Sequence, residues 1–220
     1  MSAHLSDTIA SQVDAYCHLG YPRFAGITEE DFRELAAPLI DRAAVLPHDQ
    51  EPASAGRLAA LLVVTRALIS DEARVPLLRL VDSDCKGVLD RNHSSDARQG
   101  LAHYLPRPEL AVPDAPLYLL VGVERGDEYR DITPRDALPA IAQRGRTPLT
   151  IDEGISLATV APELLAKNHC FMLAGSTRGD KRVPALWISD KAPKLGWCFD
   201  RVPHSWLGVA SASSRVGAAT

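Results

Sequence analysis

A thiol, an imidazole and a carboxylate lie in the last third of the chain, at Cys170, His204 and Glu153. This set is typical of cysteine-dependent acyl transfer, in which a histidine activates the thiol and a further polar side chain orients the histidine. A cysteine thiolate also exchanges readily with a thioester. We therefore predict that Cys170 accepts an acyl group, with His204 as the base and Glu153 as the orienting group.

Each of these residues also has a structural interpretation. Cys170 begins the apolar run Cys-Phe-Met-Leu, and a free cysteine is among the residues most often buried in a core. Glu153 follows Thr150 by three residues, which is the spacing of a helix capping box. His204 lies in a predicted turn, where a lone histidine is often a packing or surface residue. His169 is a poor partner for the neighbouring thiol, since adjacent residues of a strand face opposite ways.

Four residues near the predicted nucleophile are candidates for substrate binding. One is a carboxylate at the start of a predicted helix, where the helix dipole favours negative charge. The others are indole rings, which are suited to exclude water so that an amine receives the acyl group. These candidates are Asp152, Trp187, Trp197 and Trp206. Cys198, beside Trp197, is interpreted as structural.

A second thiol and imidazole, Cys85 and His93, lie in the polar segment 82–99. Long loops often carry function, but nothing in the pattern orients these two side chains. With Asp96 and His103 they lack the closely spaced ligand pairs of a structural zinc site. We predict no metal and no cofactor, and we keep Cys85 and His93 as the alternative pair.

Arginines lie on both sides of the predicted helix. Arg144 and Arg146 precede it, and Arg178 lies in the segment 175–182, Gly-Ser-Thr-Arg-Gly-Asp-Lys-Arg. That segment lacks the spacing of a phosphate-binding P-loop. The three arginines are candidates to bind an acidic carrier protein or the phosphate of its phosphopantetheine arm, and a solvated turn explains the segment equally well.

The composition narrows the class of protein. A chain of 220 residues is long enough to bury one sizeable core, so a single domain over 1–220 is the expectation. The net charge of −4 argues against nucleic-acid binding. The sequence shows no apolar run long enough for a membrane span and no secretory signal at its start. Four cysteines without a CxxC pair indicate a cytoplasmic protein with free thiols.

Apolar spacing predicts helices in the N-terminal part of the chain. Residues 5–19 follow a helical period, and a second helix begins after Thr28 and meets Pro38, which is expected to bend or interrupt it. The continuous apolar run 58–68 favours a buried strand. A short helix follows from Ser70 to about Leu80.

The remaining elements are mostly strands. Residues 117–123 predict a strand, Thr133 and Pro134 begin a helix that ends at Gly145, and a further helix is predicted over 151–167. The predicted C-terminal strands are 169–174, 183–189, 194–199 and 205–211. The tail 211–220 is expected to fray. The fold prediction is α+β, with N-terminal helices packed on a mixed, largely antiparallel sheet.

Several of these segments resemble an uncharacterised family of small actinobacterial proteins. The resemblance is carried by Gly145–Gly154, Asn168–Leu173, Val183–Ile188, Lys194–Cys198 and His204–Gly208. It extends back through Tyr118–Val123 and Ile132–Ala142, and so covers most of the chain. The family has no general activity that could be transferred.

Two places depart from that family's pattern and indicate a specialised member. Arg178 stands where a cysteine is expected, and segment 82–99 is longer and more polar. The chain also resembles the condensing enzymes of lincosamide antibiotic biosynthesis, which join a carrier-bound, proline-type acid to an amino sugar. That resemblance implies a carrier-protein-dependent amide synthetase acting on a small-molecule amine, and it allows a cysteine-protease-like arrangement.

Two other classes of function stay open. A hydrolase would use the same cysteine and histidine but transfer the acyl group to water. A non-catalytic binding or scaffold protein is favoured if all four cysteines are buried and unreactive.

Overall fold

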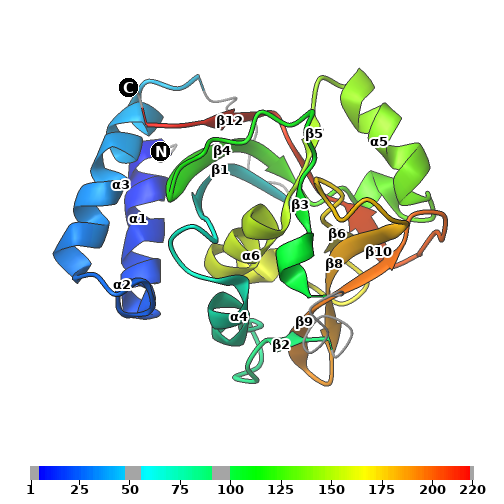
Figure 1. Cartoon of the computed structure of the whole chain (residues 1–220), viewed down its shortest axis with the longest axis horizontal. Helices are drawn as coiled ribbons and strands as arrows, with labels where there is room; N and C mark the ends of the chain where they lie inside the picture. The colour runs from blue at the N-terminus through cyan, green and yellow to red at the C-terminus, as the bar shows by residue number, and fades with distance from the viewer. Residues whose placement is uncertain (1–4, 48–55, 91–99, 219–220) are drawn as a thin grey trace.

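The computed structural model describes residues 5–47, 56–90 and 100–218 and has an α+β fold, as predicted. Three N-terminal helices lie on one side, in blue, and most of the C-terminal strands lie on the other (Figure 1). A single helix, α6 (Ile151–Val160), lies between these two parts. None of the helices in the described ranges is long and apolar enough to cross a membrane.

The N-terminal helices form as their local sequence signals predict. They are α1 (Leu5–His18), α2 (Tyr21–Ala25) and α3 (Glu29–Ala44). Thr28 and Asp31 form a reciprocal capping box at the start of α3. Pro38 lies inside α3 and does not interrupt it.

Helix α1 covers the edge of the first strand, β1 (Arg57–Val64). The Gln12 amide donates to the Ala60 carbonyl at 2.9 Å and accepts from the Leu62 N–H at 2.7 Å. The Tyr16 hydroxyl donates to the Leu62 carbonyl at 2.8 Å. These bonds satisfy backbone groups that an edge strand would otherwise leave unpaired.

The first five-stranded sheet is antiparallel throughout. Its strands are β1, β4 (Leu117–Glu124), β5 (Thr147–Pro148), β11 (Ser211–Ala212) and β12 (Ser214–Val216). The expected fraying of the tail is therefore wrong for residues 211–216, because both terminal strands pair with β4. Gly122, at φ 62°, leaves room for the Ser213 side chain, whose hydroxyl donates to the Val121 carbonyl at 2.7 Å.

The second five-stranded sheet is mixed, so the strands form separate sheets rather than the one that the sequence suggested. Its order is β10 (Leu207–Val209), β6 (Cys170–Met172), β8 (Arg182–Ser189), β9 (Ala192–Phe199) and β2 (Val88–Leu89). The β10–β6 and β2–β9 pairs are parallel, and the other pairs are antiparallel. A further short pair joins β3 (Leu105–Pro106) to β7 (Ser176–Thr177).

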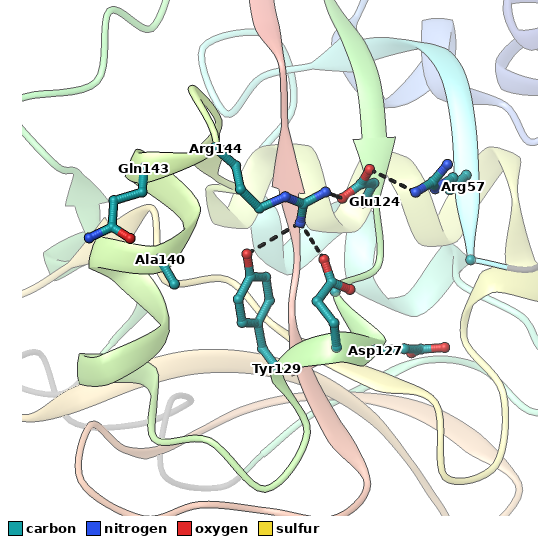
Figure 2. A pocket seen from close by; sticks show the side chains of 10 residues that line it. Arg57, Glu124, Asp127, Tyr129, Ala140, Gln143 and Arg144 are labelled. Atoms are coloured by element: carbon teal, nitrogen blue, oxygen red, sulfur yellow. Dashed lines mark hydrogen bonds and ion pairs between the residues drawn. The ribbon is translucent and has the colours of Figure 1, made fainter. Parts of the chain in front are cut away.

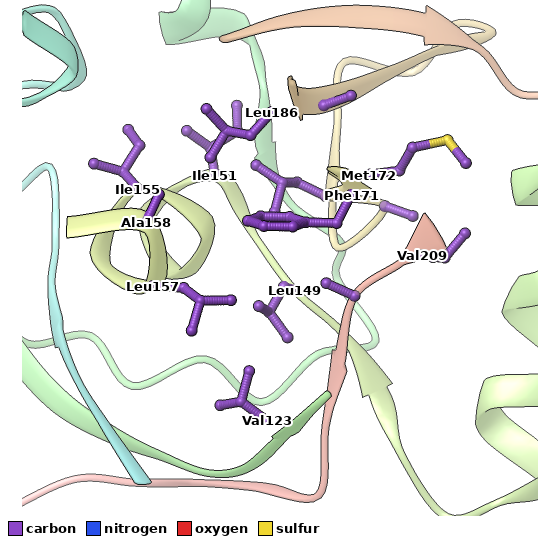
Figure 3. Packing of buried hydrophobic residues seen from close by; sticks show 14 of the residues in the cluster. Val123, Leu149, Ile151, Ile155, Leu157, Ala158, Phe171, Met172, Leu186 and Val209 are labelled. Carbon is purple, nitrogen blue, oxygen red and sulfur yellow. The ribbon is translucent and has the colours of Figure 1, made fainter. Parts of the chain in front are cut away.

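Helix α6 is buried on nearly all sides, which its apolar sequence requires. Its side chains meet those of β6, β8 and β10 in the main core, where the Phe171 ring lies beside Ile151 and Leu149 (Figure 3). The helix ends at Val160 rather than at 167, because Pro162 begins a short 3₁₀ turn.

The remaining helical elements are short, apart from α5 (Pro134–Gln143), which begins at the predicted Thr133 cap. The helix predicted from Ser70 to Leu80 is only α4 (Asp71–Arg74) followed by a 3₁₀ turn. The 3₁₀ turns are η1 (Val75–Leu77), η2 (Leu101–His103), η3 (Asp127–Tyr129) and η4 (Pro162–Leu164).

Candidate functional site

Cys170 is buried at the first position of β6, with only 3% of its surface exposed. Its thiol donates to the Ala166 carbonyl at 3.5 Å. Burial raises the pKa of the thiol, which disfavours the reactive thiolate. In this state Cys170 has the character of a core thiol.

His204 and two tryptophans lie in the same region as Cys170. Extending the register of β6 on β8, in which Met172 pairs with Ala185, places Trp187 opposite Cys170. The Trp187 and Trp206 ring centroids are 6.4 Å apart, and the His204 ring lies 5.3 Å from that of Trp206. Trp187 and Trp206 thus lie between the Cys170 thiol and the His204 imidazole.

The imidazole of His204 is itself unsatisfied. Its Nε2 atom is buried and has no hydrogen-bond partner within the described ranges. Burial lowers the pKa of His204, which keeps the ring neutral near pH 7. No hydrogen bond between its ring and Cys170 is present in the described part of the chain.

Glu153 is fully buried, and its carboxylate binds other groups than His204. It accepts from Tyr118 Oη at 2.8 Å, from Arg215 Nε at 2.6 Å and Nη2 at 2.9 Å, and from Thr150 N at 2.7 Å. The capping box with Thr150 is present, as the spacing indicated. Glu153 therefore clamps α6 to β4 and β12, and the three predicted catalytic residues are not assembled as one hydrogen-bonded set.

Trp197 lies apart from the other two tryptophans. Trp187 pairs with Lys194 across β8 and β9, and Trp197, three residues farther along β9, faces the opposite side of the sheet. The Arg182 guanidinium lies 4.7 Å from the centroid of the Trp197 ring. Beside it, burial raises the pKa of Cys198 to about 12, which agrees with a structural thiol.

The relative position of Cys85 and His93, the alternative thiol and imidazole, lies outside the described part of the structure. Cys85 is exposed, whereas His93 lies outside the described residues. All four cysteines are free thiols, and no three His, Cys, Asp or Glu side chains within the described ranges form a group suited to a metal ion.

The three predicted carrier-binding arginines fall into two groups. Arg144 and Arg146 both bind Glu124, at 2.9 and 3.3 Å. Arg178 pairs instead with Asp180 at 3.0 Å, and its guanidinium lies 5.8 Å from the centroid of the Tyr104 ring.

The structure assembles a different polar site around Asp152, in the first turn of α6. The buried Arg74 donates from Nη2 to both Asp152 and Asp71, and from Nη1 to the Val64 carbonyl. Arg66 completes the group, with its backbone N–H donating to Asp152 at 3.1 Å and its Nη2 lying 3.0 Å from Asp71. Two aspartates and two arginines from α4, α6 and the turn after β1 thus meet at the end of β1.

The Asp71 carboxyl of this site keeps its proton to a higher pH than an ordinary carboxyl does. Burial raises the pKa of Asp71 to about 6, the charge of Asp152 adds to that rise, and Arg74 opposes it. Asp71 is almost completely buried, whereas 12% of the Asp152 side chain and 27% of the Arg66 side chain are exposed. Asp152 and Arg66 are therefore the solvent-exposed members of this site, and the buried Asp71 can accept a proton near pH 6.

Sequence reasoning identified only Asp152 of these four residues. Asp71 and Arg74 lie within the short helix predicted from Ser70, and no motif marks them. One signal does mark Arg66, because it is the one charged residue of the apolar run 58–68, and a charge beside a buried strand needs a partner.

A family model matches residues 15–218, which include every residue of this site. The chain belongs to DUF5701, a family of unknown function. For this DUF5701 member no curated protein and no solved structure gives a match. An inference about the reaction of this protein therefore rests on the residues of the site.

Proposed function

We propose that this protein transfers an acyl group from the thioester of a carrier protein to a small-molecule amine, with the Asp71–Asp152 pair as its acid–base group. The observation that supports this proposal is the partly exposed Asp152 carboxylate, held beside a second carboxylate at the start of the buried helix α6. The choice of a thioester and an amine as substrates comes from the expectation that the sequence raised.

Amide formation from a thioester needs a base more than it needs a nucleophile on the enzyme. The attacking amine must lose a proton, while its nitrogen bonds to the acyl carbon and the carbon–sulfur bond breaks. The ionised Asp152 takes that proton, and the departing pantetheine thiolate receives it back, so that the products are an amide and a free thiol. A base with a pKa near the working pH is the most effective one, and Asp71, whose pKa is raised to about 6, stands behind Asp152 to take up the proton.

The two arginines position the carboxylates of this site and supply its positive charge. Arg74 is fully buried and holds both carboxylates from one nitrogen, so it fixes the distance between them. Arg66 is the more exposed cation, and it can stabilise negative charge that develops on the thioester oxygen. This arrangement makes the reaction a direct attack of the amine, without an acyl-cysteine.

Arg178 is the predicted carrier-binding arginine that lies on the same side as this pair. Its guanidinium lies over Tyr104, and the Tyr104 carbonyl accepts from Arg66 Nη1 at 2.9 Å. We expect Arg178 to meet the phosphate of the phosphopantetheine arm, whose thioester end would then reach Asp152. For Arg144 and Arg146, carrier binding stays a prediction.

The test is a condensation assay with a carrier protein loaded with an aminoacyl thioester and an amino-sugar acceptor. Mass spectrometry separates the amide from the free acid, and so separates condensation from hydrolysis. We expect Asp152→Asn to lower the amide rate by about a hundredfold or more, with Cys170→Ala close to wild type. Asp14→Asn, which changes an exposed carboxylate of α1, is the matched control.

The opposite pattern overturns the assignment. A Cys170→Ala variant without activity and an acyl adduct on Cys170 in the wild type would restore the covalent mechanism. Free acid as the main product would make the protein a thioester hydrolase.

A further inference from the structure

A hollow of about 690 Å³ lies at the other end of the β1–β4 pair from Asp152 (Figure 2). The carboxylate pair adjoins Val64, the last residue of β1, whereas the hollow adjoins Arg57, its first residue. The full lining is Gly56, Arg57, Glu124, Gly126, Asp127, Glu128, Tyr129, Ala140, Gln143 and Arg144. Its volume lies in the range of small-molecule sites.

Charged side chains of both signs line this hollow, and two of its carboxylates, Asp127 and Glu124, are held by neighbouring cations. Asp127 is bound by Arg125, with Nε at 2.8 Å and Nη2 at 2.5 Å, and by His169 Nδ1 at 3.0 Å. Glu124 is approached by Arg57 at 3.4 Å and by Arg146 at 3.3 Å. These carboxylates therefore belong to the frame of the hollow.

One ion pair stands at its opening. Arg144 Nη1 lies 2.5 Å from Glu128, and the two side chains are 41% and 45% exposed. Arg144 Nη1 also lies 3.3 Å from the Tyr129 hydroxyl, and Figure 2 shows the Arg144 guanidinium between Tyr129 and Glu124. Arg144 also has a second ionic partner, because its Nη2 donates to Glu124 at 2.9 Å. Exposed ion pairs contribute little to stability, so the pair with Glu128 opens at little cost while Glu124 keeps the guanidinium in place.

A ligand that separates Arg144 from Glu128 must replace both partners. An anion alone would satisfy Arg144 Nη1 and leave Glu128 without a counter-ion, and a cation alone would pair with Glu128 and leave Nη1 without its carboxylate. A molecule with a carboxylate and an ammonium group satisfies both at once, with its carboxylate accepting from Nη1 while Nη2 stays bound to Glu124.

We propose that this hollow binds a small zwitterion, an amino acid or short peptide whose carboxylate meets Arg144 and whose ammonium group meets Glu128. The site is separate from the carboxylate pair at Asp152 and does not depend on the proposed acyl transfer. Tyr129 and Gln143 supply further hydrogen-bonding groups at its wall.

The test is titration calorimetry on the full chain with the dipeptide alanyl-alanine as the probe. The N-acetyl dipeptide carries only the negative charge, and the dipeptide amide carries only the positive one. We expect the zwitterion to bind at least about tenfold more tightly than either form. Arg144→Gln and Glu128→Gln should each weaken it by about tenfold, whereas Arg33→Gln, which removes an exposed arginine of α3, leaves it unchanged.

Three results overturn the proposal. One is equal binding of all three probes, or of none. Another is tighter binding to Glu128→Gln, which would make the hollow an anion site. The last is binding of an acidic carrier protein, but not of the dipeptide, that depends on Arg144. Because Glu128 is exposed, its variant folds and keeps the test decisive even if Arg144→Gln proves unstable.

Discussion

Asp71 and Asp152 accept hydrogen bonds from the same nitrogen, Nη2 of Arg74. The two carboxylates come from different helices, α4 and α6, and Arg74 also binds the last carbonyl of β1. Carboxylates this close do not both ionise freely, and burial adds to the rise in the pKa of Asp71 to about 6. The same contacts hold three elements together and give the site its acid–base character.

Replacement of Cys170 by alanine is expected to preserve acyl transfer. The thiol is buried and its raised pKa disfavours the thiolate, so the reaction does not depend on it. The amide rate should stay within about twofold of wild type, while the free energy of unfolding falls by about 1 kcal/mol because core atoms are lost. Loss of the amide product from a protein that still unfolds cooperatively would contradict this expectation.

Replacement of Glu153 by glutamine is expected to act on stability. The buried Arg215 guanidinium would lose its counter-ion, and breaking one side of a buried ion pair costs about 3 to 5 kcal/mol. Urea unfolding measures this loss, with Glu29→Gln, which changes an exposed pair of α3, as the control. A cost below about 1 kcal/mol would show that Glu153 is not the clamp described above.

The sequence predicts the capping box of Glu153 but not its ion pair with Arg215, for a physical reason. The capping box of Glu153 with Thr150 is local, and its spacing alone predicts it. Arg215 lies in the C-terminal tail, whose small and polar residues predict fraying. The pairing of β12 with β4 orders this segment and brings Arg215 to α6. Long-range pairing of this kind leaves no trace in local periodicity.

Removal of β12 is expected to destabilise the fold strongly. A chain that ends at Ser213 lacks Arg215 and leaves Glu153 buried with only neutral partners, so its free energy of unfolding should fall by more than about 3 kcal/mol. A chain that ends at Gly217 keeps the strand and should unfold like the full-length protein to within about 0.5 kcal/mol. Equal stability of the two truncated chains, measured by urea unfolding, would mean that the tail contributes nothing.

Asp71 is expected to make stability fall as the pH rises. In the folded protein it keeps its proton up to a pKa of about 6, whereas the unfolded chain releases that proton near pH 4. Between these values the folded state binds more protons, so a higher pH favours unfolding. Asp71→Asn removes this dependence.

The measurement for Asp71 is a comparison of unfolding free energies between pH 4.5 and 7. The stability of Asp71→Asn relative to wild type should rise by about 2 kcal/mol over that interval, with Asp14→Asn, which changes an exposed carboxylate, as the control. A difference between variant and wild type that is constant with pH would contradict the raised pKa of Asp71.

The elements were predictable from sequence where their signals are local. The period of α1, the Thr28 cap of α3 and the apolar runs of β1 and β4 all lie within one segment each, and all four elements are present. The end of α6 was misplaced, although Pro162 marked it.

The candidate site was less predictable because its parts come from separate segments. Cys170, Trp187, Trp206 and His204 do share one region, as their clustering in the sequence suggested. Asp152, however, finds its partners at Asp71 and Arg74, and no sequence spacing connects α4 with α6. A buried charge predicts that a partner exists, but the sequence does not show which residue that partner is.

The most direct test of the proposed function is the rate of amide formation by Asp152→Asn with a loaded carrier protein and an amine, followed from pH 5 to 8. The account predicts that the wild-type rate rises through about pH 6, where Asp71 loses its proton, and that the variant, folded as judged by circular dichroism, loses about a hundredfold or more of the rate. A folded Asp152→Asn protein with the wild-type rate and pH profile would contradict it.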